Sequence, residues 1–266
     1  MAEILKVHDL RVHFHDAAPD RFAVDGVSFS VQEGEIVGLV GESGSGKTVT
    51  AMSISGLMPK RKAEKSGSIT LDGSEIFQCS DKEILDILGE ELGIVFQEPM
   101  TAMNPVMRIG PQVEECLRVH TELTKAERKA RALEAMEWAE LNDPETVYNK
   151  YPHELSGGML QRVMIAAAII SRPKLLLADE PTTALDVTIQ AEILELLQRL
   201  NKEHNMAIIL ISHNLHVVRK LCDRVLVMQR GKLVEDRSVE DIFRDPQHEY
   251  TKRLIAAIPT RERKLI

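Results

Sequence analysis

The feature that most constrains the fold of this chain is a short apolar run, EIVGLV at 35–40, that leads directly into the loop GESGSGKT at 41–48. Such a run is typical of a buried strand in a parallel sheet, and segment 49–58 after the loop has helical character. The loop fits the pattern G-x-x-x-x-G-K-[ST], in which successive backbone N–H groups surround phosphate oxygens at the N-terminus of a helix. The sequence therefore predicts an α/β core with a phosphate-binding loop.

Each residue type in this loop has a chemical reason to be there. Glycine lets the backbone turn tightly and approach a phosphate closely. Lys47 can place a mobile positive charge on the β- and γ-phosphates, and Thr48 offers a hydroxyl oxygen to Mg²⁺. We therefore expect ATP and Mg²⁺ as ligands. The residues expected to contact the nucleotide here are Gly41, Glu42, Ser43, Gly44, Ser45, Gly46, Lys47, Thr48 and Val49.

A second chemical feature is the run LLLADE at 175–180, an apolar strand that ends in two carboxylates. By itself an acidic pair after a strand is usually a solvated loop, but the phosphate loop upstream favours a functional interpretation. Phosphoryl transfer needs mainly positioning and charge stabilisation, so one carboxylate on the metal side and one on the water side are sufficient. We expect Asp179 to hold Mg²⁺ and Glu180 to polarise the attacking water.

Hydrophobic patterning divides the chain into an α/β core and a helical insertion. Segments 4–14 and 24–31 alternate apolar and polar residues as half-buried strands do. The middle of the chain has helical spacing, with helices expected at 112–120 and 125–141 and a capping box at Thr124. The predicted division is 1–97 and 159–238 as the nucleotide-binding core with an antiparallel β subdomain, 98–158 as an inserted helical subdomain, and 239–266 as a short, mostly helical tail that ends in a solvated segment at 261–264.

Residues 155–159 read LSGGM, and at this point the sequence resembles the ABC ATPases, whose signature is LSGGQ or a close variant. The order of motifs also fits: the phosphate loop, a glutamine after a strand, the signature, LLLADE, TALD at 183–186 and ISH at 211–213. The resemblance covers essentially the whole chain. It implies a P-loop NTPase (RecA-like) core of the ABC ATPase type, with the signature at the end of the helical subdomain. Met159 replaces the family's Gln but leaves the serine and glycines, so hydrolysis is still expected.

The resemblance implies roles for single residues. Gln97 would link the metal site to the helical subdomain and sense the membrane partner, His213 would contact the γ-phosphate, and Asp186 would lie at the dimer seam. The catalytic residues implied are Glu180, His213, Lys47 and Gln97, and the Mg²⁺ ligands implied are Thr48, Gln97 and Asp179.

A further implication is that two molecules share each nucleotide. Ser156, Gly157 and Gly158 would form a second anion site at a helix N-terminus and close on the ATP held by the other molecule. Phe14 is expected to stack on adenine, with Phe22 as the alternative.

Longer segments narrow the resemblance to the ATPases of peptide and nickel importers. These segments are 96–110, 179–194 and 245–259, and SGGMLQR at 156–162 favours nickel or metal-chelate members over di- or oligopeptide members. The partners implied are a second ABC ATPase subunit (a paralogue or a copy of this chain), two integral membrane permeases and an extracytoplasmic solute-binding protein. The chain would lie peripherally on the cytoplasmic face of the inner membrane. The alternative is an ATPase subunit of a non-transport complex such as one for phosphonate degradation.

Composition sets further limits. The net charge is -8, which argues against nucleic acid as a partner because DNA binding usually needs a basic face. No stretch of 18 uninterrupted apolar residues occurs, so no membrane-spanning helix is expected. The three cysteines are scattered without metal-ligand spacing, so we expect reduced thiols and no iron–sulfur cluster.

Overall fold

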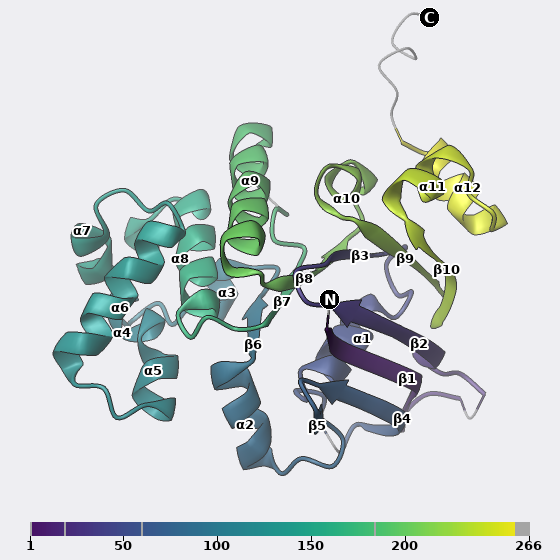
Figure 1. The fold of residues 1–266 in the computed structure, drawn as a ribbon, viewed down its shortest axis with the longest axis horizontal. Helices are drawn as coiled ribbons and strands as arrows, with labels where there is room; N and C mark the ends of the chain where they lie inside the picture. The colour runs from purple at the N-terminus through teal and green to yellow at the C-terminus, as the bar shows by residue number, and fades with distance from the viewer. Residues whose placement is uncertain (1, 19, 60, 184, 259–266) are drawn as a thin grey trace, which may run out of the picture.

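The computed structural model describes residues 2–18, 20–59, 61–183 and 185–258. Within these residues the strands form two sheets (Figure 1). An antiparallel sheet has the order β2-β1-β4-β5, from β1 (Glu3–Phe14), β2 (Val24–Gln32), β4 (Ala63–Leu71) and β5 (Ser74–Glu75). The larger sheet has the order β10-β9-β3-β8-β7-β6, from β3 (Ile36–Val40), β6 (Leu92–Val95), β7 (Leu175–Asp179), β8 (Ala207–Ser212), β9 (Arg224–Gln229) and β10 (Lys232–Ser238).

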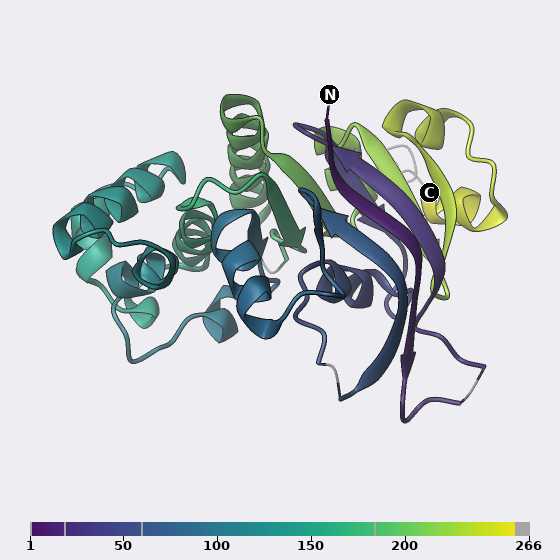
Figure 2. The same cartoon turned by 60° about the horizontal axis from the view of Figure 1, so that its bottom comes forward.

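The helices occupy three places in the chain. The helix after β3 is α1 (Lys47–Ile54), and α2 (Asp81–Glu90) precedes β6. A group of helices follows β6: α3 (Pro99–Ala102), α4 (Ile109–Val113), α5 (Glu115–His120), α6 (Lys125–Trp138), α7 (Pro144–Asn149), the 3₁₀ turn η1 (Pro152–Glu154) and α8 (Gly157–Ile169). The last set is α9 (Val187–His204), α10 (Leu215–Leu221), α11 (Val239–Arg244) and α12 (Glu249–Ala256). In Figures 1 and 2 the helices α4 to α7 lie together on one side of the molecule, whereas α8 packs against β6 of the larger sheet.

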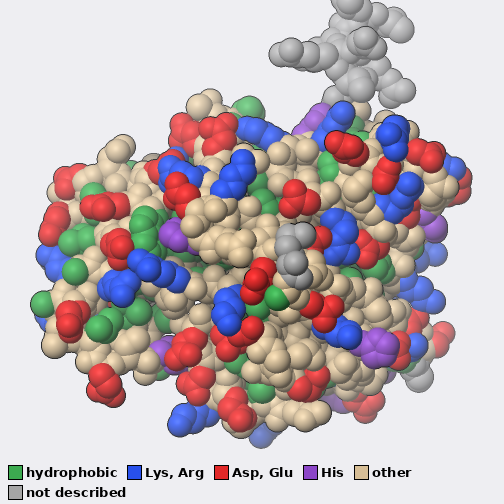
Figure 3. Space-filling view, viewed as in Figure 1, with side chains coloured by type: hydrophobic (Ala, Val, Ile, Leu, Met, Phe, Trp, Pro, Cys, Tyr) green, Lys and Arg blue, Asp and Glu red, His purple; other side chains and the backbone are tan. Residues whose placement is uncertain are grey.

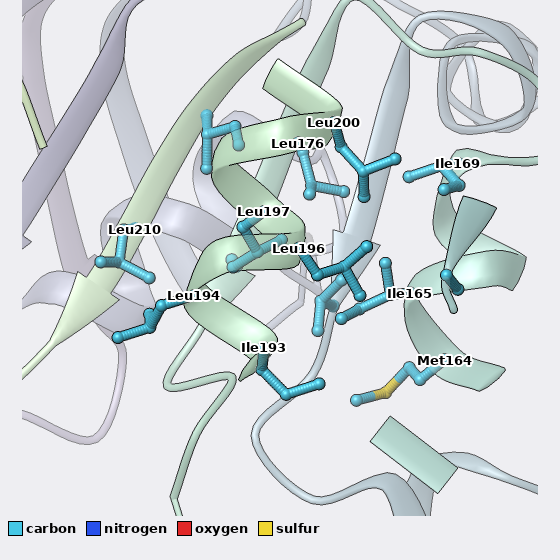
Figure 4. Close-up of a cluster of buried hydrophobic side chains, with 14 of the residues drawn as sticks. Met164, Ile165, Ile169, Leu176, Ile193, Leu194, Leu196, Leu197, Leu200 and Leu210 are labelled. Carbon is cyan, nitrogen blue, oxygen red and sulfur yellow. The ribbon is translucent and has the colours of Figure 1, made fainter. Parts of the chain in front are cut away.

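The central strands β3, β7 and β8 of the larger sheet are buried on both faces, as their continuous apolar runs predict, whereas the edge strand β10 is mostly partly or fully exposed. In β3, Val37 and Leu39 join the core that also contains the inner residues of the antiparallel sheet, whereas Ile36 and Val40 join the core under α8, α9 and α10. Figure 4 shows side chains of α9 between those of the sheet and those of α8. Full burial of each such aliphatic side chain contributes about 1.5–3 kcal/mol, so this packing holds the strand ends in fixed positions.

Most expected elements are present, with differences at their ends. The expected helix at 49–58 begins earlier, at Lys47, and ends at Ile54, because Gly56 follows with a positive φ of 69°. The prediction of a helix at 112–120 was wrong at its start, because the helix begins at Ile109. It is also divided at Glu114, although Glu114 keeps right-handed helical angles. The capping box at Thr124 is confirmed, since its hydroxyl accepts from Glu127 N.

The subdomain boundaries at 97/98 and 158/159 stay predictions, and α8 runs continuously across the second of them. After β10 the described part of the tail is mostly helical, as expected, with α11 and α12 joined by a short link, while segment 261–264 lies outside the described residues. No helix in the described ranges has the length and apolarity needed to cross a bilayer. All three cysteines are free thiols. On the face shown in Figure 3, acidic and basic side chains are interspersed.

Candidate active site

Three neighbouring parallel strands bring the predicted site residues to one edge of the sheet. β8 pairs with both β3 and β7, with Val40 opposite Ser212 and Asp179 opposite Ile211. The residues that follow these strand ends therefore meet, which is where ligands bind in open α/β sheets. They line a cavity of about 710 Å³, whose walls are Phe14, Ala23, Glu42, Ser43, Gly44, Gly46, Lys47, Thr48, Val49, Gln97, Asp179, Glu180 and His213.

The phosphate loop requires glycine at two points of close backbone approach. A Cβ on Gly41 would lie 2.3 Å from the carbonyl oxygen of Met228, and one on Gly46 would lie 2.6 Å from that of Ala23. Gly46 also has a φ of 108°, which side chains rarely adopt. The loop is thus packed between β9 and the segment before β2, and it turns directly into α1.

Lys47 lies inside this loop and not in solvent. Its side chain is buried, and its Nζ donates to the carbonyl oxygens of Gly41 at 2.8 Å and Glu42 at 3.0 Å. Burial lowers the pKa of Lys47, while the negative charges of Glu180 and Asp179 oppose that shift. The ammonium group is therefore already positioned at the loop with backbone carbonyls as its partners.

Two polar groups at or beside the cavity are consistent with binding of a phosphate and a cation. The Ser45 hydroxyl is buried, and in the described part of the chain it has no hydrogen-bond partner. Burial, and next the charge of Glu180, raise the pKa of Asp179, whereas Lys47 lowers it. A positive ion beside Asp179 would relieve this unfavourable burial of negative charge. Oxygen donors such as those of Asp179, Thr48 and Gln97 are the ligands that Mg²⁺ prefers.

The carboxylate of Glu180 is held by three side chains. Gln97 Nε2 and Thr183 Oγ1 each donate to Oε2 at 2.9 Å, and His213 Nδ1 lies 2.8 Å from Oε1. Glu180 itself has a φ of 46°, a backbone conformation that is uncommon for non-glycine residues and that other residues of the chain, such as Asp72 and Asn205, also adopt. The structure therefore brings Gln97, Glu180 and His213 together, while the roles that the resemblance implies for them stay predictions.

Thr183 is a site residue that the sequence reasoning did not single out. It lies on the same turn as Glu180, since Thr183 N donates to the Glu180 carbonyl oxygen at 3.1 Å. The available signal was a hydroxyl side chain three residues after the second carboxylate of LLLADE. A hydroxyl at this distance can reach back to the carboxylate through the turn.

Both candidate aromatic residues for adenine lie beside the loop. Phe14 and Phe22 line a second cavity of about 830 Å³, which also contains Gly44, but only Phe14 lines the cavity with Lys47 and Glu180 as well. Phe22 packs edge-on against His13, with ring centroids 5.4 Å apart. Phe14 therefore remains the preferred stacking residue.

The signature residues do not line this cavity within one molecule. Ser156 caps the N-terminus of α8, accepting from Met159 N at 3.3 Å, and Asp186 caps α9, accepting from Ile189 N at 3.0 Å. A Cβ on Gly158 would lie 2.8 Å from Ile189, so the two helix starts pack closely. Ser156, Gly157 and Gly158 form the N-terminus of α8, and Ser156 and Gly157 are exposed there.

Known proteins similar to this chain are ATP-binding proteins of transporters. The family model "ABC transporter" matches residues 24–183. The chain is 50% identical over 97% of its length to the peptidoglycan transport ATP-binding protein YejF of Agrobacterium fabrum, of which it spans only 48%. It is 46% identical over 98% of its length to the oligopeptide transport ATP-binding protein OppD of Bacillus subtilis, and 45% over 96% to the dipeptide transport ATP-binding protein DppD of Escherichia coli, spanning 74% and 78% of them.

Solved structures of ATP-binding cassettes have a similar fold. A dimeric structure of the ATP-binding cassette MJ0796 in a post-hydrolysis state, bound to ADP and Pi, has a TM-score of 0.78 and 29% identity, covering 88% of this chain and 98% of that one. The phosphate loop, the strand-end carboxylates and these similarities together show that the chain belongs to the ABC transporter family and is an ATPase of that family.

Proposed function

We propose that this chain hydrolyses MgATP in the 710 Å³ cavity and, in a dimer with a second ATPase subunit, drives the import of di- or oligopeptides through membrane permeases. The observation that carries the proposal is the convergence of the buried Lys47 with Glu180, which is held by Gln97 and His213. In this arrangement a positive charge and an oriented base face the same space, as phosphoryl transfer requires.

Each residue has a chemical task in this mechanism. Lys47 pairs with the oxygens of the β- and γ-phosphates, and the amides of the loop bind the remaining oxygens. Glu180 accepts a proton from the attacking water, and general-base catalysis of this kind contributes roughly 10²- to 10⁴-fold to the rate. His213 orients Glu180 and contacts the γ-phosphate. Thr48, Gln97 and Asp179 would hold Mg²⁺, which would neutralise part of the phosphate charge.

The position of the signature supports a shared site. Ser156, Gly157 and Gly158 form a helix N-terminus outside the cavity of their own molecule, and such a terminus favours an anion. We infer that they bind the nucleotide of the second subunit, with Asp186 at the seam and the pairing partner either a paralogue or a copy of this chain. The related cassette MJ0796 is described as dimeric.

An apolar groove supports docking of a permease. A cavity of about 310 Å³ between the core and the helical group is lined by Leu57, Phe96, Met103, Cys116 and Met164, among others. Leu57 and Phe96 are exposed, at 41% and 47%. Phe96 directly precedes Gln97, so a permease helix in this groove would lie next to the residue that holds Glu180. The chain would then be peripheral on the cytoplasmic face of the inner membrane.

The relatives favour peptides as the transported class. The names of those compared above refer to oligopeptide, dipeptide and peptidoglycan transport. The preference for nickel or metal chelates that the sequence suggested finds no support among them. Peptide import, with a solute-binding protein and two permeases as partners, is therefore the function we propose.

The test is the variant Glu180→Gln, which keeps the size and hydrogen-bonding capacity of the side chain but removes the base. We expect MgATP binding to persist, turnover to fall at least about 100-fold, and a dimer to accumulate with ATP in size-exclusion chromatography. Glu195→Gln, an exposed position on α9, is the matched control and should hydrolyse ATP normally. Unchanged turnover of Glu180→Gln would refute the assignment of the base.

A second experiment tests the partners. Proteins that co-purify with the chain from membranes, identified by mass, would distinguish peptide permeases from a non-transport complex.

A further inference from the structure

The C-terminal helix α12 contacts the phosphate loop through one buried side chain. In Figure 1, α12 lies beside β10, on the opposite side of the molecule from α4 to α8. Its residue Tyr250 is 2% exposed, and the Tyr250 hydroxyl accepts a hydrogen bond of 2.8 Å from the backbone N–H of Glu42. Glu42 is the second residue of the phosphate loop, more than 200 positions earlier in the sequence.

This contact and Lys47 act on the same peptide group. The amide between residues 41 and 42 has its carbonyl on Gly41, which accepts from Lys47 Nζ at 2.8 Å, and its N–H on Glu42, which donates to Tyr250. The group is therefore held at both ends. If Lys47 Nζ moved to a phosphate and left the Gly41 carbonyl, the bond to Tyr250 would still hold the N–H end of this peptide group.

The position of Tyr250 is itself fixed by neighbouring contacts. Gln247 N donates to Glu235 Oε1 on β10 at 2.7 Å, and His248 caps α12 by accepting from Tyr250 N at 3.2 Å. The Arg253 guanidinium lies 5.9 Å from the Tyr250 ring centroid. Burial raises the pKa of Tyr250, so its hydroxyl stays protonated and neutral. A rigid acceptor on a packed helix can define the orientation of the loop peptide.

We propose that Tyr250 is a positioning residue for the phosphate loop: its hydroxyl holds the peptide between Gly41 and Glu42 in the orientation that binds nucleotide, which makes α12 part of the ATP site. This inference rests on the proposed function, because it assumes that the loop binds ATP. It goes further in assigning a role to the C-terminal segment, of which residues 239–258, the part that the structure describes, contribute nothing to the walls of either cavity beside the loop.

The experiment is Tyr250→Phe in the full-length chain, with the dissociation constant for MgADP measured by calorimetry and KM and kcat for MgATP measured in parallel. Loss of one hydrogen bond should weaken MgADP binding and raise KM by about five- to tenfold, while kcat changes by less than about twofold. Tyr148→Phe is the matched control. That tyrosine hydroxyl donates to Glu114 in the helical group, far from the loop, so the variant should bind MgADP like the wild type.

The outcomes separate the two claims. If the wild-type chain does not bind MgADP, the proposed function fails. If it binds and Tyr250→Phe binds equally tightly, only the role of Tyr250 is overturned. Hydrogen exchange at the Glu42 amide of the wild type tests the contact without any substitution. We expect protection already in the absence of nucleotide, and protection that appears only with MgADP would overturn the proposal.

Discussion

At the scale of residues, the site is defined by which donors surround one carboxylate. The Glu180 side chain is only 16% exposed. Gln97, Thr183 and His213 contact it from three separate segments of the chain. Gln97 follows β6 and His213 follows β8, so both depend on the larger sheet for their positions. Thr183 depends only on the local turn, because its N–H donates to the Glu180 carbonyl oxygen.

Replacement of Thr183 should therefore affect turnover and not nucleotide binding. Thr183→Val keeps the shape of the side chain but removes the donor to Glu180, and we expect kcat to fall about five- to tenfold with KM for MgATP unchanged. Thr183→Ser restores the hydroxyl and should recover most of the activity in the same steady-state assay. A wild-type kcat for Thr183→Val would show that the hydroxyl does not position the base.

At the scale of elements, helix starts serve both stability and the site. The Ser156 side chain caps α8 and also belongs to the proposed anion site, whereas the equivalent Thr124 cap on α6 has no such second role. Loss of a capping hydroxyl destabilises a protein by about 1 kcal/mol in either position. The two helices thus provide an internal comparison between a purely structural cap and one that is also functional.

The comparison predicts different results for two similar variants. Ser156→Ala and Thr124→Ala should each lower the free energy of unfolding by about 1 kcal/mol in chemical denaturation. Only Ser156→Ala should also reduce ATPase activity, because it alters the surface that we assign to the second subunit's nucleotide. Equal activity of the two variants at saturating MgATP would count against that assignment.

At the scale of the whole molecule, charged side chains connect the helical group to the core. Glu140, between α6 and α7, accepts from Arg162 of α8 at 2.7 Å and also pairs with Arg199 of α9. Arg162 is largely buried and also binds Glu192 of α9 at 2.9 Å. Burial would raise the pKa of Glu140, but hydrogen bonds from Arg162 and the charge of Arg199 outweigh it and hold that pKa below its usual range.

A pH-dependent loss of stability follows from this network. A carboxylate whose pKa is lowered on folding contributes stability at neutral pH, and the contribution is lost as the pH falls through its folded pKa. Glu140→Gln should therefore lower the free energy of unfolding by about 1 kcal/mol at pH 7, and the difference from wild type should disappear in acid. Glu195→Gln, which breaks an exposed pair with Lys220, should change little at any pH. A difference for Glu140→Gln that persists in acid would contradict this explanation.

The sequence by itself determined the local chemistry, because spacing along the chain is enough to specify it. The loop 41–48, the carboxylates Asp179 and Glu180 and the caps at Thr124 and Ser156 all depend on residues within a few positions of each other. Strand burial in the larger sheet was also predictable, since continuous apolar runs need cover on both faces.

Only the tertiary structure decided which distant groups meet. Nothing in the local sequence around Glu42 indicates that its N–H binds Tyr250, and the salt-bridge network around Glu140 joins residues more than 20 positions apart. The sequence also did not predict that helical residues begin at Ile109 or that the helix is interrupted at Glu114. Glu114 is buried and accepts a hydrogen bond from Tyr148 of another helix, a contact that spacing along the chain does not indicate. Such contacts are set by the packing of whole elements against a common core, and that packing fixes side chains whose sequence separation carries no periodic signal.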